Sequence, residues 1–470
     1  MRNKVKSNIL LIVIFLSIFV SLLAWWISLP IFQSFDEPAH FAQIQHIAMY
    51  GTYDTNSTIS IEEYKLFQFL SFATNSRYTF NKNINAKGEK SFKKEYSSIH
   101  DQKTFKYSGT VEAYPPLYYF LAAGIYKIFS TRSIFFQIES IRFLSIIFFL
   151  ITIFFSYKSS QIIFKKDRLA QYTTVIFIGF LPMLSQFTVS INPDNLIITL
   201  FSIFTYYGLK ILNSKTLDIR SNIMAIIVIL LGILTKQSAY LLIPVLLLLY
   251  VVQVHKFKIN LKRDKRVYLI APLLIIMIVL LLYLKGFNLI YSYITTTFQG
   301  LTVFSPFTYI ANYYNNYLQN GYVFQSFWGT FGWGYFKFRQ QYYDILFFLS
   351  TLSFVGIFIY LYNYIHYYKI LHKKYKNLLN ILYLIFIVSI YSIFLIYLDF
   401  ISLKNTRDFF IQGHYFFPVI TSISILLVYG LQQLIRKKYL LHIVYTSVIV
   451  LIVIFNITAL FGILIHAFYL

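Results

Sequence analysis

The sequence predicts an all-α transmembrane fold, a polytopic helical bundle of about eleven spans in one integral membrane domain, residues 1–470. Three observations predict it. Hydrophobic residues make up 58% of the chain, and charged residues only 12%. The apolar residues form long unbroken runs, unlike the alternating segments of about ten residues in membrane barrels. Most lysines and arginines fall between these runs, so the net charge of +24 indicates membrane topology and not a nucleic-acid partner.

The first apolar run, residues 9–29, follows Arg2, Lys4 and Lys6 and predicts a helix that crosses from inside to outside. It is long and has no small-residue cleavage site, so we expect an anchored helix. Residues 30–140 contain no convincing span and are predicted to form a large extracytoplasmic loop with surface helices. Within this loop, residues 114–129 are predicted to be a re-entrant or surface helix, because the run is only marginally long enough to cross a bilayer.

Short basic segments lie at alternate connections between the remaining apolar runs and are predicted to be cytoplasmic turns. These spans are residues 142–164, 169–190, 196–212, 223–234, 238–254, 267–284, 344–365, 378–398, 415–434 and 441–466. A second large outer loop is predicted at residues 285–343. If residues 114–129 formed a full span, every basic turn after it would face outward, which positive-inside statistics oppose.

Cysteine is absent, which excludes disulfides, thiolate metal sites and cysteine nucleophiles. The sequence also contains no P-loop, dinucleotide fingerprint or nucleophile elbow. Cofactors that bind through those devices are therefore not predicted.

The candidate catalytic residues are Asp36 and Glu37, which directly follow the first span. Pro38 and Gly51 bracket a short helix whose apolar positions recur at helical spacing, so it is predicted to lie along the membrane surface. Charge beside lipid is costly and usually has a function. Carboxylates are also favoured at helix starts, and Glu37, before the proline, is the predicted cap. That leaves Asp36 as a base for an acceptor hydroxyl.

His40 lies one helical turn after Asp36, so these two residues are a candidate pair of ligands for a divalent metal ion. Two protein ligands are too few for a site. The alternative interpretation is a polar histidine on the wet face of a surface helix.

Further candidate substrate-binding residues fall in later outer segments. Asp194, in INPDN, either caps the next span or supplies a second carboxylate for substrate or metal. Lys236, in ILTKQSAY, either snorkels to headgroups or binds the phosphate of an anionic lipid substrate. Arg407 and His414 lie in the last outer loop. Convergence of these residues on one membrane face is better support for a site than any one motif.

Aromatic and glycine residues alternate in QSFWGTFGWGYFKFR, which contains Trp328 and Trp333. This segment is either an interfacial aromatic belt or a platform for a sugar or lipid. The density of glycine favours a shaped loop, so both tryptophans are candidate substrate contacts.

The order of these motifs resembles the GT-C superfamily of polytopic glycosyltransferases, which use polyprenyl-phosphate-linked sugars. The shared layout is an acidic pair after the first span, a large outer loop with PPLYY near its end, a basic inner turn and an outer NPD. FDEPAHF, SFWGTFGW and QGHYFFP together resemble more closely a bacterial branch of predicted membrane proteins in that superfamily. The resemblance covers nearly the whole chain.

The resemblance implies that Asp36 is the catalytic acid of the first outer loop, with Asp194 as the second-loop acid and Lys236 near the donor phosphate. That branch usually has arginine where this chain has His414. If the arginine grips a phosphate, Arg407, Lys404 or a protonated His414 must replace it here.

These observations predict an inverting membrane glycosyltransferase of the bacterial plasma membrane, with its active site facing outward. Its predicted partners are a polyprenyl-phosphate-linked sugar, a cell-envelope glycan or lipid-linked acceptor, and membrane lipids. The alternatives are an envelope glycan polymerase or ligase, and a lipid-linked glycan flippase or transporter. A transporter is expected to place charges near the membrane midplane, whereas this chain places them at helix ends.

Overall fold

The structure is a computed structural model that describes residues 2–53, 57–69, 104–107, 114–257, 321–367, 377–406 and 411–470. Within these ranges, eight helices are long and apolar enough to cross a membrane. They are Ile9–Ser28, Ile134–Phe164, Asp194–Asn213, Gln237–Lys256, Gln340–His366, Leu378–Ser402, Gly413–Leu434 and Lys438–Tyr469. The polytopic all-α fold predicted from the sequence is confirmed.

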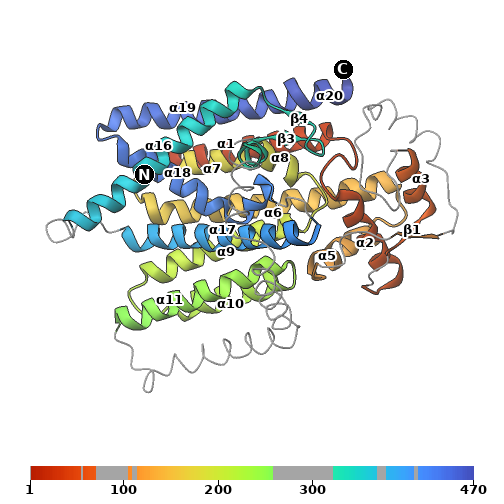
Figure 1. The fold of residues 1–470 in the computed structure, drawn as a ribbon, viewed down its shortest axis with the longest axis horizontal. Helices are drawn as coiled ribbons and strands as arrows, with labels where there is room; N and C mark the ends of the chain where they lie inside the picture. Colours follow the sequence, from red (N-terminus) through yellow and green to blue (C-terminus); the bar gives the residue numbers. More distant parts are fainter. Residues whose placement is uncertain are drawn as a thin grey trace.

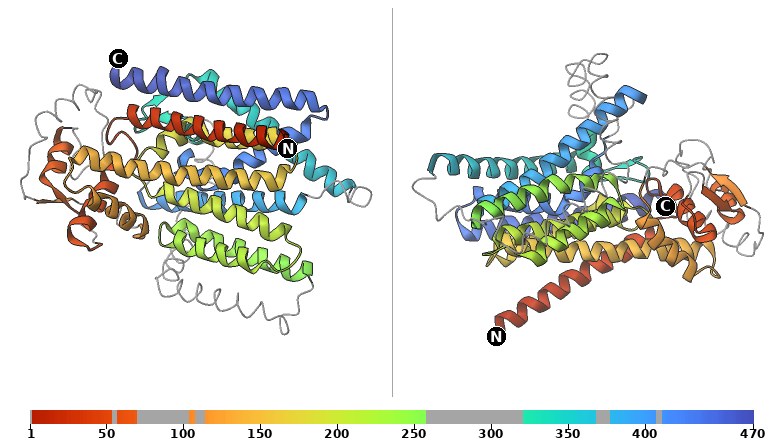
Figure 2. Two further views of the ribbon diagram at one scale, coloured as in Figure 1. Left: turned by 180° about the vertical axis from the view of Figure 1, so that it is seen from behind. Right: turned by 90° about the horizontal axis from the view of Figure 1, so that it is seen from below.

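Long helices lie side by side along one direction and form the body of the molecule (Figures 1 and 2). They are α1 (Arg2–Ser28), α6 (Ile134–Phe164), α9 (Asp194–Asn213), α10 (Ile219–Ile233), α11 (Leu242–Phe257), α16 (Gln340–Tyr367), α17 (Leu378–Thr406), α18 (Ile420–Leu434) and α19 (Lys438–Ile457). Small residues permit the closest approach: a Cβ on Gly356 of α16 would lie 1.9 Å from the carbonyl oxygen of Gly430 of α18. Such glycine contacts are typical of helix packing in membranes.

The predicted span at residues 169–190 is two helices, α7 (Arg168–Gly179) and α8 (Pro182–Thr188). Pro182 begins the second helix because its ring cannot continue the first. The freed Phe180 carbonyl accepts a hydrogen bond from Asn456 Nδ2 of α19 at 3.1 Å. Asn456 also accepts one from the Trp25 indole nitrogen of α1 at 3.0 Å, so a polar side chain compensates for the break inside the bundle.

Several shorter elements form an end cap on the bundle (Figure 1). The end cap consists of α2 (Glu37–Tyr50), β1 (Ser57–Ser60), α3 (Ile61–Phe69), β2 (Thr104–Tyr107) and α5 (Leu117–Ile128). Strands β1 and β2 pair antiparallel, with Ser57 opposite Tyr107. Helix α5 has 12 residues, too few to cross a bilayer.

Helix α2 presents no apolar stripe to its surroundings, and its location along the membrane surface stays a prediction. Its residues from Glu37 to Ile47 are all buried, because α5 and β1 pack over it. Its polar side chains form hydrogen bonds within the end cap. Gln45 Oε1, for example, accepts a hydrogen bond from the Ser60 backbone nitrogen at 2.6 Å. A helix covered on all sides needs no lipid-facing stripe.

The described residues also form further short elements, of which β3, β4 and α20 lie at the same end of the bundle as the end cap (Figure 1). The further short elements are η2 (Gln237–Leu241), α15 (Tyr322–Trp328), the antiparallel pair β3 (Thr330–Phe331) and β4 (Phe336–Lys337), η5 (Gly413–Val419), the π-helix η6 (Thr458–Ile465) and α20 (His466–Tyr469). The N-terminus of α1 lies at the opposite end, where α6 also finishes (Figure 2). The basic turn after α6 is thus remote from the start of α2. The predicted span at residues 267–284 and most of the second outer loop lie outside the described residues.

Candidate functional site

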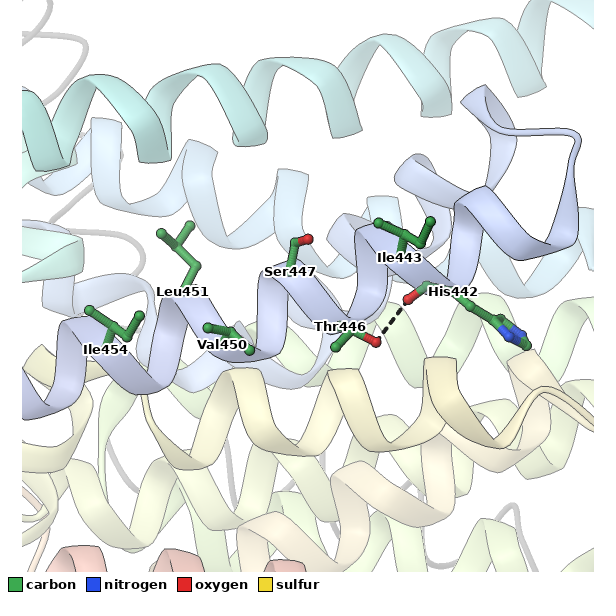
Figure 3. Close-up of a pocket in the computed structure, with 7 residues that line it drawn as sticks. All are labelled: His442, Ile443, Thr446, Ser447, Val450, Leu451 and Ile454. Carbon is green, nitrogen blue, oxygen red and sulfur yellow. Dashed lines mark hydrogen bonds between the residues drawn. The ribbon is translucent and has the colours of Figure 1, made fainter.

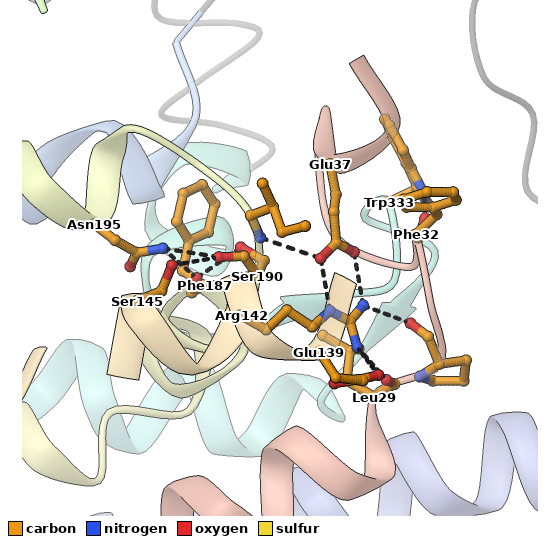
Figure 4. A network of polar contacts seen from close by, with 12 residues as sticks. Leu29, Phe32, Glu37, Glu139, Arg142, Ser145, Phe187, Ser190, Asn195 and Trp333 are labelled. Carbon is orange, nitrogen blue, oxygen red and sulfur yellow. Dashed lines mark hydrogen bonds and ion pairs between the residues drawn. The ribbon is translucent and has the colours of Figure 1, made fainter. Parts of the chain in front are cut away.

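A buried ion pair fixes the start of α2 against α6 (Figure 4). Arg142 Nε and Nη2 each lie 2.7 Å from one carboxylate oxygen of Glu37, and both side chains are 0% exposed. Arg142 also donates to the backbone oxygens of Leu29 at 2.9 Å and Pro30 at 3.0 Å. Glu37 Oε1 accepts from the Ile191 backbone nitrogen at 3.1 Å. This network joins the end of α1, the start of α2, the first third of α6 and the segment before α9.

The predicted cap role of Glu37 is therefore wrong, and its carboxylate has no face open to a substrate. Sequence reasoning placed Arg142 at the start of a span, whereas α6 begins at Ile134 and Arg142 lies inside it. A single arginine within an apolar run was the available signal, because such a charge needs a buried acidic partner.

Asp36 adjoins Glu37 but differs from it in backbone conformation, exposure and partners. It occupies the N-cap position of α2 in the left-handed region, with φ 55° and ψ 6°, and its side chain makes no capping hydrogen bond. Its backbone oxygen still accepts from the His40 nitrogen at 3.1 Å. The side chain is exposed and has no hydrogen bond or ion pair within the described part of the chain. This backbone conformation is unfavourable for most residues and frequent at functional sites.

Asp194 and Lys236 form an ion pair close to Asp36. Asp194 begins α9, and its backbone nitrogen donates to Asn192 Oδ1 at 2.8 Å. Its carboxylate pairs with the ammonium group of Lys236, whose side chain remains 20% exposed. Lys236 Nζ lies 5.2 Å from the centre of the Tyr114 ring, within range of a cation–π interaction. We name Asp36, Asp194, Lys236 and Tyr114 the polar cluster.

The pKa shifts show that the members of the polar cluster interact. Desolvation by the surrounding protein raises the pKa of Asp36 although the side chain keeps an exposed face; Asp194 raises this pKa further and Lys236 lowers it, with a net increase. Burial opposes charge on Lys236, but Asp194 and nearby phenols outweigh it, so the pKa of Lys236 is above its ordinary value. Lys236 lowers the pKa of Tyr114, but burial and the two carboxylates raise it overall. At neutral pH, Lys236 is therefore cationic and Tyr114 neutral.

His40 is buried and does not lie on a wet helix face, contrary to the prediction. Its Nδ1 lies 2.9 Å from the Tyr119 hydroxyl of α5, at hydrogen-bond distance. Burial and Lys236 lower the pKa of His40 to about 3, so the ring is neutral. Among the described residues, no group of three or more histidine, aspartate or glutamate side chains could hold a metal ion. The metal pair of Asp36 and His40 stays a prediction.

His414 packs among aromatic rings next to the polar cluster. Its ring centre lies 5.1 Å from that of Phe35 and 4.8 Å from that of Phe187. The side chain is buried, and Nδ1 has no hydrogen-bond partner among the residues that the structure describes. The structure therefore does not present His414 to solvent as a phosphate contact.

The two candidate tryptophans have different surroundings. Trp333 is partly exposed, donates from its indole nitrogen to the Phe32 backbone oxygen at 3.0 Å and lies against Phe35. Trp328 is buried and packs edge-to-face on Phe177 of α7. Trp328 is thus a core residue and offers no platform, which corrects the prediction for that position.

The structure brings Asp36, Asp194 and Lys236 together, from segments far apart in the sequence. Tyr114 joins them, although sequence reasoning did not single it out. Arg407 lies outside the described residues.

A surface groove of about 510 Å³ follows one face of α19 (Figure 3). Its lining runs from His442 to Ile454, all from one candidate span, and it contains no acidic residue. The groove shares no residue with the polar cluster.

A model of the family described as "Predicted membrane protein (DUF2142)" matches residues 19–423. Among solved structures, the chain is similar to ArnT from Cupriavidus metallidurans bound to undecaprenyl phosphate, with 14% identity and a TM-score of 0.42. That similarity covers 93% of this chain and 63% of the other, so the chain spans less than two thirds of its length. For ArnT in the apo state, the identity is 13%, the TM-score 0.42 and the coverage 96% and 75%. No curated protein sequence matches the chain.

Proposed function

The chain belongs to the DUF2142 family of predicted membrane proteins, and we propose that it is a membrane glycosyltransferase. It transfers a sugar from a polyprenyl-phosphate donor to an extracytoplasmic cell-envelope glycan or lipid-linked acceptor. One observation carries the proposal: the exposed carboxylate of Asp36, which has no partner within the described part of the chain, stands beside the Asp194–Lys236 ion pair at one end of a membrane bundle.

The position of the polar cluster suits a lipid-linked donor. A polyprenyl chain lies in the bilayer, so its phosphate and sugar are presented at the membrane surface, where helix ends meet water. The phosphate gains negative charge as its bond to the sugar breaks, and fixed cationic donors stabilise that charge. Lys236 remains protonated and partly exposed, and an ammonium group has three N–H donors, of which Asp194 needs only one. The neutral Tyr114 hydroxyl supplies a further donor.

Asp36 is the proposed general base. Its side chain is exposed, and its raised pKa makes it a stronger proton acceptor than an ordinary aspartate. It takes the proton from the acceptor hydroxyl as the oxygen attacks the anomeric carbon. Attack from the side opposite the phosphate inverts that carbon.

The buried ion pair positions this base. Arg142 donates hydrogen bonds to the backbone oxygens of Leu29 and Pro30 and to the Glu37 carboxylate. Asp36 lies between these residues, so the segment that carries it is attached to α6 at both ends. Glu37 also holds the Ile191 nitrogen, shortly before Asp194. One network thus sets the separation of Asp36 and Asp194.

The polar cluster has a net charge of −1 when Asp36 is ionised, because two carboxylates surround one ammonium group. A donor phosphate therefore needs further positive charge. Arg407 is the proposed source, and a divalent ion bound at the carboxylates would serve the same purpose.

A deletion strain complemented with wild type, Asp36→Asn or Asp344→Asn tests the proposal. Asp344 is an exposed acid outside the polar cluster and serves as the matched control. We expect the deletion and Asp36→Asn strains to lose the same single sugar from surface glycans and to accumulate its polyprenyl-phosphate conjugate in lipid extracts. Wild type and Asp344→Asn should restore both. Unchanged glycans and lipid pools in the deletion strain would overturn the function, whereas an active Asp36→Asn variant would overturn only the role of Asp36.

A further inference from the structure

A second groove, of about 630 Å³, lies at the same end of the bundle as the end cap. One wall is β4 with the residues after it, and the other is the last part of the C-terminal span, η6 and α20. None of its lining residues belongs to the polar cluster. Trp333, before β4, contacts Phe35 beside Asp36, whereas the groove begins at Tyr335.

The groove carries three basic side chains from two distant parts of the sequence: Lys337, Arg339 and His466. All three are exposed, and none forms an ion pair within the part of the chain that the structure describes. No acidic residue lines the groove. The nearest acid in sequence, Asp344, accepts a hydrogen bond from Gln340 at 3.0 Å. The groove therefore presents uncompensated positive charge.

Apart from Thr458 and His466, the opposite wall is apolar, and it lies in a candidate membrane span. Gly462, Ile463 and Ala467 lie in the candidate span Lys438–Tyr469. A Cβ on Gly462 would meet only the Thr458 methyl group, at 3.6 Å, so the glycine leaves this wall open. The backbone here is a π-helix, a rare conformation that is frequent at functional sites.

We propose that this groove binds the phosphate headgroup of an anionic membrane phospholipid, with the lipid chains along η6. Arginine and lysine together suit a phosphate, since the guanidinium group binds two oxygens and the ammonium group adds a mobile charge. Tyr335, 57% exposed, stands at the rim, where amphipathic rings meet headgroups. A partly apolar groove at a helix end is suited to a lipid, whose charged head and chains are joined, more than to a free anion. The inference is independent of the glycosyltransferase proposal.

Native mass spectrometry of the purified full-length protein tests this site. We would compare retention of phosphatidylglycerol and phosphatidylcholine by wild type, by Lys337→Gln/Arg339→Gln and by the control Lys127→Gln/Arg132→Gln. The control residues are exposed and belong to the same end of the molecule, but they line no part of the groove.

We expect the groove variant to retain phosphatidylglycerol about ten- to thirtyfold less well than wild type, from the loss of about 1 kcal/mol per basic residue. Retention of phosphatidylcholine should not change, and the control should behave as wild type. Thermal unfolding of both variants verifies that they are folded. Equal phosphatidylglycerol retention by the two double variants, or an equal loss of both lipids in the groove variant, would overturn the proposal.

Discussion

Asp36 and Glu37 are adjacent in the sequence and share the same chemistry, yet the structure treats them in opposite ways. Glu37 is fully buried, with both carboxylate oxygens bound by Arg142. Asp36 is exposed, in a strained backbone conformation, with no partner among the described residues. The contrast shows that the acidic pair divides its work: one carboxylate holds the fold, and the other is available for chemistry.

The division follows from backbone geometry. A left-handed residue directly before a helix turns the chain sharply, so side chains on either side of the turn leave in different directions. Glu37, inside the helix, reaches α6, while Asp36 stays outside it. Sequence reasoning treated the two as one site because adjacency was the only information available.

The largest expected effect comes from Arg142→Met, which leaves the Glu37 carboxylate buried without its cation. We expect it to lower the free energy of unfolding by about 3–5 kcal/mol, a large share of the usual 5–15 kcal/mol. Thermal unfolding in detergent measures it. The double variant Glu37→Met/Arg142→Met should recover most of that loss, because replacing both charges removes the buried unpaired group. A stable single variant would contradict the anchoring role.

Asp36→Asn should act on activity and leave stability alone. Asparagine tolerates the left-handed region, so the backbone is kept while the base is removed. We expect the rate of sugar transfer from the lipid-linked donor to fall by about 10²–10⁴-fold, with the unfolding temperature unchanged. If Asp36→Asn lost as much stability as Arg142→Met, Asp36 would have a structural role like that of Glu37, which would contradict the assignment.

The pH dependence of transfer sharpens the comparison further. The raised pKa of Asp36 means that activity falls, as pH decreases, at a higher pH than the ordinary aspartate value of 3.8 predicts. Asp194 raises this pKa and Lys236 lowers it, so neutral replacements should move the midpoint in opposite directions. Asp194→Asn should move it down and Lys236→Gln up, in a pH–rate profile of residual activity. Shifts in the same direction would contradict the assignment of the base.

The smallest expected effect concerns Glu63 in α3, a buried carboxyl group that has no arginine partner among the described residues. Neither oxygen has a hydrogen-bond partner among the described residues, and burial raises its pKa well above 4.5. Its contribution to stability is therefore complete below pH 4.5 and is lost as pH rises through the folded-state pKa.

Glu63→Gln removes this titration. We expect its unfolding temperature relative to wild type to rise from pH 4.5 upward and then to level off, while Glu62→Gln, at a partly exposed neighbour, shows no such trend. A flat difference for Glu63→Gln would mean that burial does not raise the pKa of Glu63.

The sequence by itself determined the all-α membrane class and the approximate order of the spans, because long apolar runs and basic turns are local properties of the chain. It also indicated Asp36, Asp194 and Lys236 as residues of one face, since alternating crossings place helix ends on predictable sides. Only the tertiary structure decided that Glu37 pairs with Arg142, that His40 and Trp328 are buried, and that Asp194 neutralises Lys236. Those outcomes depend on side-chain contacts between residues that lie more than forty positions apart in the sequence. Neither hydrophobic periodicity nor charge spacing along the chain predicts such long-range contacts.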